Sequence, residues 1–110
     1  MEDSLNKDFW EKFSFSGDVT YAETWLDEDM LLVEYPAKLI LDAGFYHGTF
    51  RVYIIWDNNW QSPVAMYSCR KTENFEKIIR LAIEQIEKEV IQKRFSYYGK
   101  LWETIKISLE

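Results

Sequence analysis

The sequence predicts an α+β fold, a two-layer sandwich in which an antiparallel sheet of about five to six strands packs against one long helix, with a short N-terminal helix. Three observations predict it. Apolar and polar residues alternate between residues 19 and 69, turn residues separate these segments, and one long segment with helical spacing follows. The helix and the sheet each have one apolar face that must be buried, so we expect residues 1–110 to form a single α+β domain.

The N-terminal residues predict a short amphipathic helix over 4–14. Asp3 or Ser4 can cap its start, and Gly17 can end it. The apolar residues that recur at helical spacing, and that would pack on the sheet, are Leu5, Phe9, Trp10 and Phe13.

Five segments predict strands, because β-branched and aromatic residues alternate in them or because turn residues bound them. His47-Gly48 predicts a two-residue hairpin turn, since glycine accepts the positive φ that such turns need. Asp57-Asn58-Asn59 predicts a second turn. The predicted strands are 19–26, 30–35, 38–45, 49–56 and 63–69.

A long helix is predicted to begin at Thr72, which can cap it, and Glu73 lies favourably at the positive end of its dipole. One apolar stripe runs along this helix: Phe75, Ile78, Ile79, Ala82, Ile83, Ile86 and Val90. Pairs of opposite charge at i,i+4 spacing are expected to brace its outer side: Glu73–Lys77, Glu76–Arg80, Glu84–Lys88 and Glu89–Lys93.

The C-terminal end of the chain has two interpretations. Leu81, Ile91 and Phe95 lie off the main stripe and predict a small apolar patch, which 101–109 is expected to cover. The spacing in 101–109 suits a helix or a strand. Its alternation of apolar and polar residues favours a last strand after Gly99.

Composition excludes several classes of protein. Apolar content of 47%, with 17% aromatic residues, suffices for a core and argues against disorder. Cys69 is the only cysteine, which excludes a secreted domain held by disulfides. The acidic N-terminus lacks signal-peptide features, and no apolar run could span a bilayer. We therefore expect a soluble cytoplasmic protein that does not bind membranes.

Charge is distributed unevenly along the chain. Residues 1–60 hold 12 Asp and Glu against 4 Lys and Arg, whereas residues 61–110 hold 7 against 9. This asymmetry predicts an acidic surface and a basic protein partner. The net charge of −6 argues against binding to nucleic-acid phosphates, which requires a cationic surface.

No pattern in the sequence predicts catalysis, a cofactor or a metal site. His47 precedes glycine in a predicted turn and has no evident partner. Cys69 ends an apolar strand, which predicts a buried, unreactive thiol rather than a nucleophile paired with His47. Asp27-Glu28-Asp29 lacks the glycine and the distal glutamate of a calcium loop. We therefore expect a protein that is not an enzyme.

Two segments are candidates for binding a partner. In one, carboxylates alternate with aromatic residues on two adjacent predicted strands; the alternative is a solvated turn whose charges deter edge-to-edge aggregation. In the other, Trp60 lies in a polar turn and either folds over the sheet as a lid or projects as an anchor. The candidate residues are Glu23, Trp25, Asp27, Glu28, Asp29, Glu34, Tyr35, Asp57 and Trp60.

These features together predict a small acidic inhibitor, of the immunity or antitoxin type, that occludes the basic active site of a cognate bacterial toxin such as a nuclease domain. The alternative is an acidic nucleic-acid mimic, as in phage proteins that act against restriction or CRISPR systems. A third interpretation is a small-ligand site in a cavity between sheet and helix. The sequence leaves the oligomeric state open.

Overall fold

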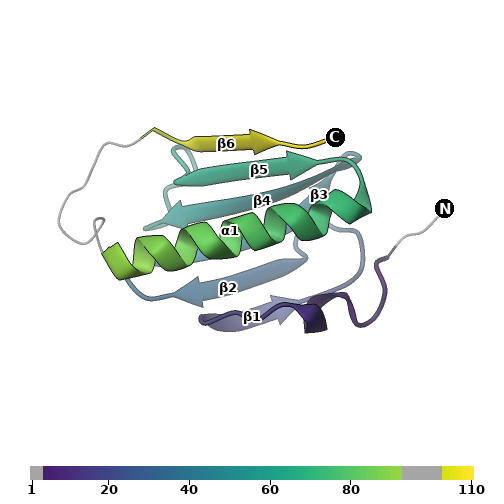
Figure 1. Cartoon of the computed structure of the whole chain (residues 1–110), viewed down its shortest axis with the longest axis horizontal. Helices are drawn as coiled ribbons and strands as arrows, with labels where there is room; N and C mark the ends of the chain where they lie inside the picture. Colours follow the sequence, from purple (N-terminus) through teal and green to yellow (C-terminus); the bar gives the residue numbers. More distant parts are fainter. Residues whose placement is uncertain (1–3, 93–102) are drawn as a thin grey trace.

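The computed structural model describes residues 4–92 and 103–110. Within this part of the chain six strands form one sheet, in sequence order, and a long helix lies across one face of it (Figure 1). The predicted α+β fold with two layers is confirmed. The elements are the 3₁₀ helix η1 (Phe9–Lys12), β1 (Asp18–Ala22), β2 (Leu31–Tyr35), β3 (Leu39–Tyr46), β4 (Thr49–Trp56), β5 (Ala65–Cys69), α1 (Thr72–Gln92) and β6 (Ile105–Ser108).

The sheet is mixed. From β1 to β5 each strand pairs antiparallel with the next, through short connections. β6 runs parallel to β5, and this pair departs from the antiparallel arrangement expected of the whole sheet. Parallel neighbours need a long crossover connection, and α1 stands between these two strands in the chain.

The core lies between α1 and the sheet. Five residues of the predicted stripe of α1 are fully covered there: Phe75, Ile78, Ile79, Ala82 and Ile86. The other two, Ile83 and Val90, are partly buried. The opposing side chains come from alternate positions of the strands: Leu31, Val33, Leu41, Val52, Ile54, Ala65 and Tyr67. The other face of the sheet, here called the open face, is not covered by α1 (Figure 1).

Both predicted turns are confirmed. His47 and Gly48 have φ of 50° and 84°, and the flanking residues Tyr46 and Thr49 pair directly, as in a two-residue hairpin. After β4 the chain turns at two residues in the left-handed region, Asp57 and Asn58, with φ of 53° and 58°. Asparagine and aspartate tolerate this conformation better than most residues.

The predicted N-terminal helix over 4–14 is wrong in its extent and type. The structure has only the four-residue 3₁₀ helix Phe9–Lys12. Before it, residues 7–8 form a turn, and the backbone N–H of Leu5 donates to the carbonyl oxygen of Thr24 at 2.7 Å. This long-range pairing replaces the first turns of the expected helix.

The apolar spacing that suggested the helix instead builds an aromatic cluster. Phe9 and Phe13 are buried, and Phe9 stacks on Phe75 of α1 with ring centroids 5.5 Å apart. The indole N–H of Trp10 donates to the carbonyl oxygen of Glu23 at 2.8 Å. The N-terminal segment is thus fixed to α1 and to the chain that follows β1.

The first strand is shorter than the predicted 19–26. It ends at Ala22, and its register with β2 shifts between Val19 and Tyr21. An irregularity of this kind breaks the period-two alternation on which the longer strand was predicted. Trp25 lies beyond the strand and forms only an isolated bridge with Ser4.

The outer side of α1 also differs from expectation. Glu76 and Arg80 pair at 3.1 Å, but the Glu73–Lys77 and Glu84–Lys88 pairs do not form. Glu89 is 1% exposed, so it cannot brace the outer side. It follows Ala82 and Ile86 at intervals of four and three residues, which continues the buried face of the helix. Lys93, its expected partner, lies outside the described residues.

The predicted last strand is confirmed as β6, in which half-buried Ile105 and Ile107 alternate with exposed Lys106 and Ser108. Leu109 lines a shallow hollow together with Leu81, and so meets part of the second apolar patch of α1. Ile91 stays exposed. Phe95 and residues 99–102 lie outside the described residues. None of the helices in the described residues has the length and apolar character that crossing a membrane requires.

Candidate functional site

The connection between β1 and β2 carries most of the predicted acidic residues. We call residues 23–29 the acidic connection. Asp27 accepts a hydrogen bond from the backbone N–H of Phe45 through its carbonyl oxygen at 2.7 Å. The carbonyl of Glu28 lies so close over Gly44 that a Cβ there would clash with it. The acidic connection therefore crosses the open face at the end of β3 in a fixed position.

The carboxylates of this connection are not neutralised by neighbouring cations. Glu23, Asp27, Glu28 and Asp29 are exposed, as is Glu34 on β2, and within the described part of the chain none of them forms an ion pair. The surface is therefore acidic and free to meet cations from outside.

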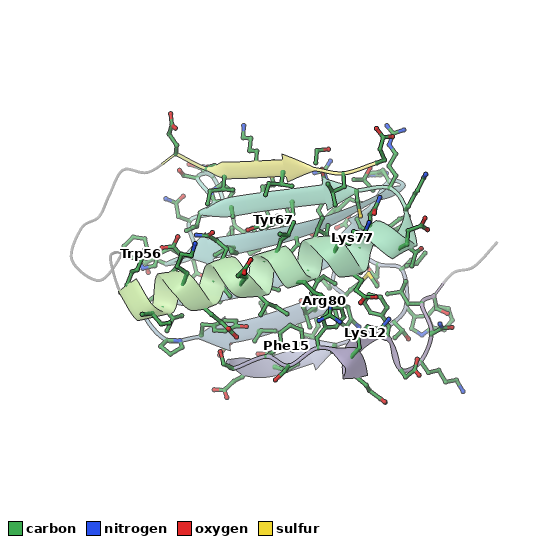
Figure 2. The ribbon with its side chains drawn as sticks, viewed as in Figure 1. Lys12, Phe15, Trp56, Tyr67, Lys77 and Arg80 are labelled. Atoms are coloured by element: carbon green, nitrogen blue, oxygen red, sulfur yellow. The ribbon has the colours of Figure 1, made fainter. Side chains whose placement is uncertain are left out.

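Two cations, Lys12 in η1 and Arg80 in α1, pair within the helix layer. Lys12 and Arg80 both reach Glu76, at 3.2 and 3.1 Å, at the junction of η1 and α1 (Figure 2). The guanidinium of Arg80 also lies over the ring of Phe13, 4.8 Å from its centroid. These contacts belong to the helix layer of the sandwich, so they do not offset the charge of the acidic connection.

Two predicted contact residues are not part of this surface. Tyr35 is buried, because Glu34 and Tyr35 are adjacent in a strand and so face opposite sides of the sheet. Asp57 lies beside Leu39, at the opposite end of β3 from the acidic connection, and pairs with Lys38 at 3.8 Å. The expectation that these residues share one binding surface with Asp27–Asp29 is therefore wrong.

The two candidate tryptophans differ in their contacts. Trp25 is 64% exposed in the acidic connection. Trp60 is 47% exposed and packs edge-on against Tyr53, with ring centroids 5.9 Å apart. Tyr53 lies on the open face, so Trp60 folds over the sheet as in the lid interpretation while half of its surface stays accessible.

The structure adds a residue that the sequence interpretation missed. Asp42 lies near the middle of β3 on the open face, where the strand register places it opposite Leu32 on β2 and Tyr53 on β4. Its side chain is only 7% exposed. Burial, and then the charge of Asp29, raises the pKa of Asp42 to about 7. The sequence feature that could have indicated this residue is that Asp42 is the only charged residue in the otherwise mostly apolar segment of β3.

Two tyrosines share this environment. Burial and then Asp42 raise the pKa of Tyr46 to about 12, and the same two causes, followed by Asp29, raise the pKa of Tyr21. The strand register places Tyr21 and Asp42 on the same face, on either side of Leu32, and Tyr46 follows Asp42 on that face of β3. Asp42, the acidic connection and the two tyrosines therefore form one continuous site on the open face.

The candidate nucleophile is unsuited to catalysis. Cys69 is buried, as predicted, and its thiol donates a weak hydrogen bond to the carbonyl oxygen of Lys71 at 3.5 Å. Burial raises the pKa of the Cys69 thiol to about 11, so the thiol stays protonated at neutral pH. His47 is exposed in its hairpin turn. Over residues 4–92 and 103–110, no three side chains of His, Cys, Asp or Glu are grouped to hold a metal ion.

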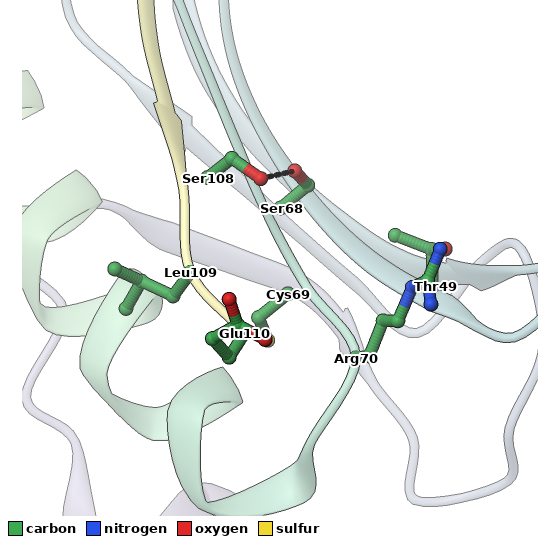
Figure 3. Close-up of a pocket in the computed structure, with 7 residues that line it drawn as sticks. All are labelled: Thr49, Ser68, Cys69, Arg70, Ser108, Leu109 and Glu110. Atoms are coloured by element: carbon green, nitrogen blue, oxygen red, sulfur yellow. Dashed lines mark hydrogen bonds between the residues drawn. The ribbon is translucent and has the colours of Figure 1, made fainter.

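A hollow of about 380 Å³ lies at the ends of β5 and β6, and its lining includes Thr49, which pairs with Tyr46 across β3 and β4 (Figure 3). Ser68 and Ser108 line it side by side, and the hydroxyl of Ser68 donates to the hydroxyl oxygen of Ser108 at 3.3 Å (Figure 3). Its lining includes both Arg70 and Glu110. The hollow lies at the edge of the sheet, whereas the third interpretation expects a ligand cavity between sheet and helix.

Comparison with known proteins finds no family model, no curated protein and no solved structure that matches this chain. Function is therefore argued from the site itself, since a fold class alone does not imply an activity. The features that carry the argument are the unpaired carboxylates, the exposed aromatic rings and the buried Asp42.

Proposed function

We propose that this protein is a small acidic inhibitor of the immunity or antitoxin type, which covers the basic active site of a cognate bacterial toxin in the cytoplasm. The proposed mechanism is occlusion. Carboxylates of the acidic connection pair with the lysines and arginines that would otherwise hold the toxin's substrate, and exposed aromatic rings anchor the contact.

The observation that carries this proposal is the fixed position of four exposed carboxylates without ion pairs in the described residues. Unpaired like charges held in one place repel each other, and a cationic partner relieves that repulsion. Such a surface also accelerates association, because long-range attraction steers a basic partner toward it. Trp25 supplies an exposed ring in the same segment.

The test compares two charge-reversal variants with equal changes in net charge. In the first, lysine replaces the four carboxylates of the acidic connection: Glu23, Asp27, Glu28 and Asp29. In the second, lysine replaces four exposed carboxylates outside the open-face site: Glu11, Glu84, Glu103 and Glu110. Each variant and the wild type are used to capture the partner from the native source, and the captured proteins are identified by mass spectrometry.

We expect the wild type and the second variant to capture a basic toxin domain, and the first variant to lose it. The association rate should fall about tenfold or more in the first variant, and its dependence on salt should flatten. Co-expression should show that the wild type suppresses the toxicity of the captured domain. Equal capture by both variants would refute the role of the acidic connection. Capture of a basic nucleic-acid-binding effector without toxicity would favour the nucleic-acid mimic instead.

A further inference from the structure

Asp42 carries a nearly buried carboxyl group that has no partner among the described residues. Its side chain is 7% exposed, and within residues 4–92 and 103–110 its carboxylate accepts no hydrogen bond and forms no ion pair. Buried polar groups in proteins are almost always hydrogen-bonded, because an unsatisfied one loses its hydration without compensation. Asp42 keeps 7% of its surface open to solvent, and no donor from the described residues occupies its carboxylate, so the carboxylate is available to a ligand.

The surroundings of Asp42 are arranged around negative charge and aromatic rings. Tyr21 comes from β1, Tyr46 from the end of β3, and Asp29 from the acidic connection. The nearby cation, Arg51, is held by tyrosines: its guanidinium lies over the ring of Tyr46 at 5.5 Å and donates to the hydroxyl of Tyr53 at 3.5 Å. It leaves the carboxylate of Asp42 unpaired.

We propose that Asp42 and Asp29, with the rings of Tyr21 and Tyr46, form a receptor for one arginine guanidinium of the basic partner. This inference rests on the proposed function, since it names the group that the acidic surface receives. A guanidinium fits better than an ammonium group, because its planar fork binds a carboxylate through two hydrogen bonds while its face stacks on aromatic rings.

The receptor is held in place before the partner binds. Asp42 is in the backbone ladder of β3, paired on both sides, and the close approach of Glu28 to Gly44 fixes the chain that carries Asp29. A site that is already rigid loses little conformational entropy on binding. Tyr21 and Tyr46 are half-buried and Asp42 is 7% exposed, so part of each group stays in contact with solvent.

Binding of a cation should be linked to release of the Asp42 proton. Because burial and Asp29 raise the pKa of Asp42 to about 7, a large share of the molecules must lose a proton to bind at neutral pH. The affinity for a guanidinium should therefore rise about tenfold between pH 6 and pH 8. The titratable groups that interact with the charge of Asp42 are Asp29, Tyr21 and Tyr46, and the strand register places Tyr53 opposite it. Arg51 contacts Tyr46 and Tyr53, and Glu23, Asp27 and Glu28 act on Tyr21 or Tyr46.

The test uses N-acetyl-arginine N-methylamide as the probe and the corresponding citrulline compound, which has the same shape without charge, as the control. NMR spectra of the labelled protein are recorded during titration at pH 6 and pH 8. We expect saturable shifts at the amides of Asp42, Asp29 and Tyr46 with the arginine compound only. The Asp42→Asn variant should lose at least fivefold in affinity, whereas Asp18→Asn, which alters an exposed carboxylate outside the site, should stay within twofold.

The outcomes separate this inference from the proposed function. Equal binding of the arginine compound by wild type and Asp42→Asn, or no site-specific shifts with it, would overturn the receptor. If the captured partner then still binds through the acidic connection, the proposed inhibitor stands without this receptor. If instead the arginine compound binds at Asp42 but no basic toxin is captured, the receptor stands and the inhibitor proposal falls. Circular dichroism of Asp42→Asn confirms that the variant is folded.

Discussion

Replacement of Asp42 by asparagine is expected to stabilise the protein at high pH and to have little effect at low pH. Asparagine has nearly the shape of a protonated aspartate but cannot ionise. In the folded state the pKa of Asp42 is raised to about 7, whereas an aspartate in the unfolded chain titrates near 3.9. Ionisation above pH 7 therefore takes place in an environment that disfavours the charge.

The sign and size of the effect follow from linkage between protonation and folding. Between pH 4 and pH 7 the folded state binds more protons than the unfolded state, so the free energy of unfolding falls as pH rises. A difference of about three pKa units corresponds to roughly 4 kcal/mol. Asp42 lies on the water-facing side of the sheet, and solvent screening reduces this to about 1–3 kcal/mol.

Urea unfolding, followed by tryptophan fluorescence at constant ionic strength, measures the effect. At pH 8 the Asp42→Asn variant should be more stable than the wild type by about 1–3 kcal/mol, and at pH 4 the two should agree within about 0.5 kcal/mol. The Asp18→Asn variant should show no such pH-dependent gain, since Asp18 is exposed. A difference between Asp42→Asn and wild type that is the same at pH 4 and pH 8 would refute the linkage argument.

Three further predictions concern stability and reactivity. Gly44→Ala should lower the free energy of unfolding by about 2–3 kcal/mol, because the added Cβ would meet the backbone of Glu28. Gly48→Ala should lower it by only about 1 kcal/mol, because the position has open space and only its positive φ opposes alanine. Urea unfolding measures both variants, and equal losses of stability would contradict this reasoning. Phe75→Ala should lower the free energy of unfolding by about 3–5 kcal/mol in calorimetry, because its buried ring stacks on Phe9 and Phe50. A loss below about 1 kcal/mol would contradict a tightly packed core at this position. Cys69 should react with a thiol reagent only at the rate of unfolding, and rapid labelling of the native protein at pH 7 would contradict its burial.

Elements defined by local signals could be predicted from the sequence. The strand over 49–56 and the His47-Gly48 turn are found where alternation and glycine place them. α1 begins at Thr72, but the carbonyl oxygen of Lys71 accepts the first helical hydrogen bond, from the backbone N–H of Phe75 at 3.1 Å, so Thr72 is the first helical residue and not the cap. The N-terminal helix was not predictable in this way. Its apolar spacing is real, but the backbone of Leu5 pairs with Thr24, a contact that helical periodicity does not encode.

The sequence by itself supplied the chemical groups of the candidate site: an acidic segment with a tryptophan, and a carboxylate in an otherwise apolar strand whose role the sequence interpretation missed. The tertiary structure alone decided which of these residues meet. Tyr35 turned to the core, Asp57 was placed at the far end of β3, and Asp42 was buried among groups from other strands. Burial and electrostatic interaction depend on distances in space between segments that are far apart in the chain, so no local pattern specifies them.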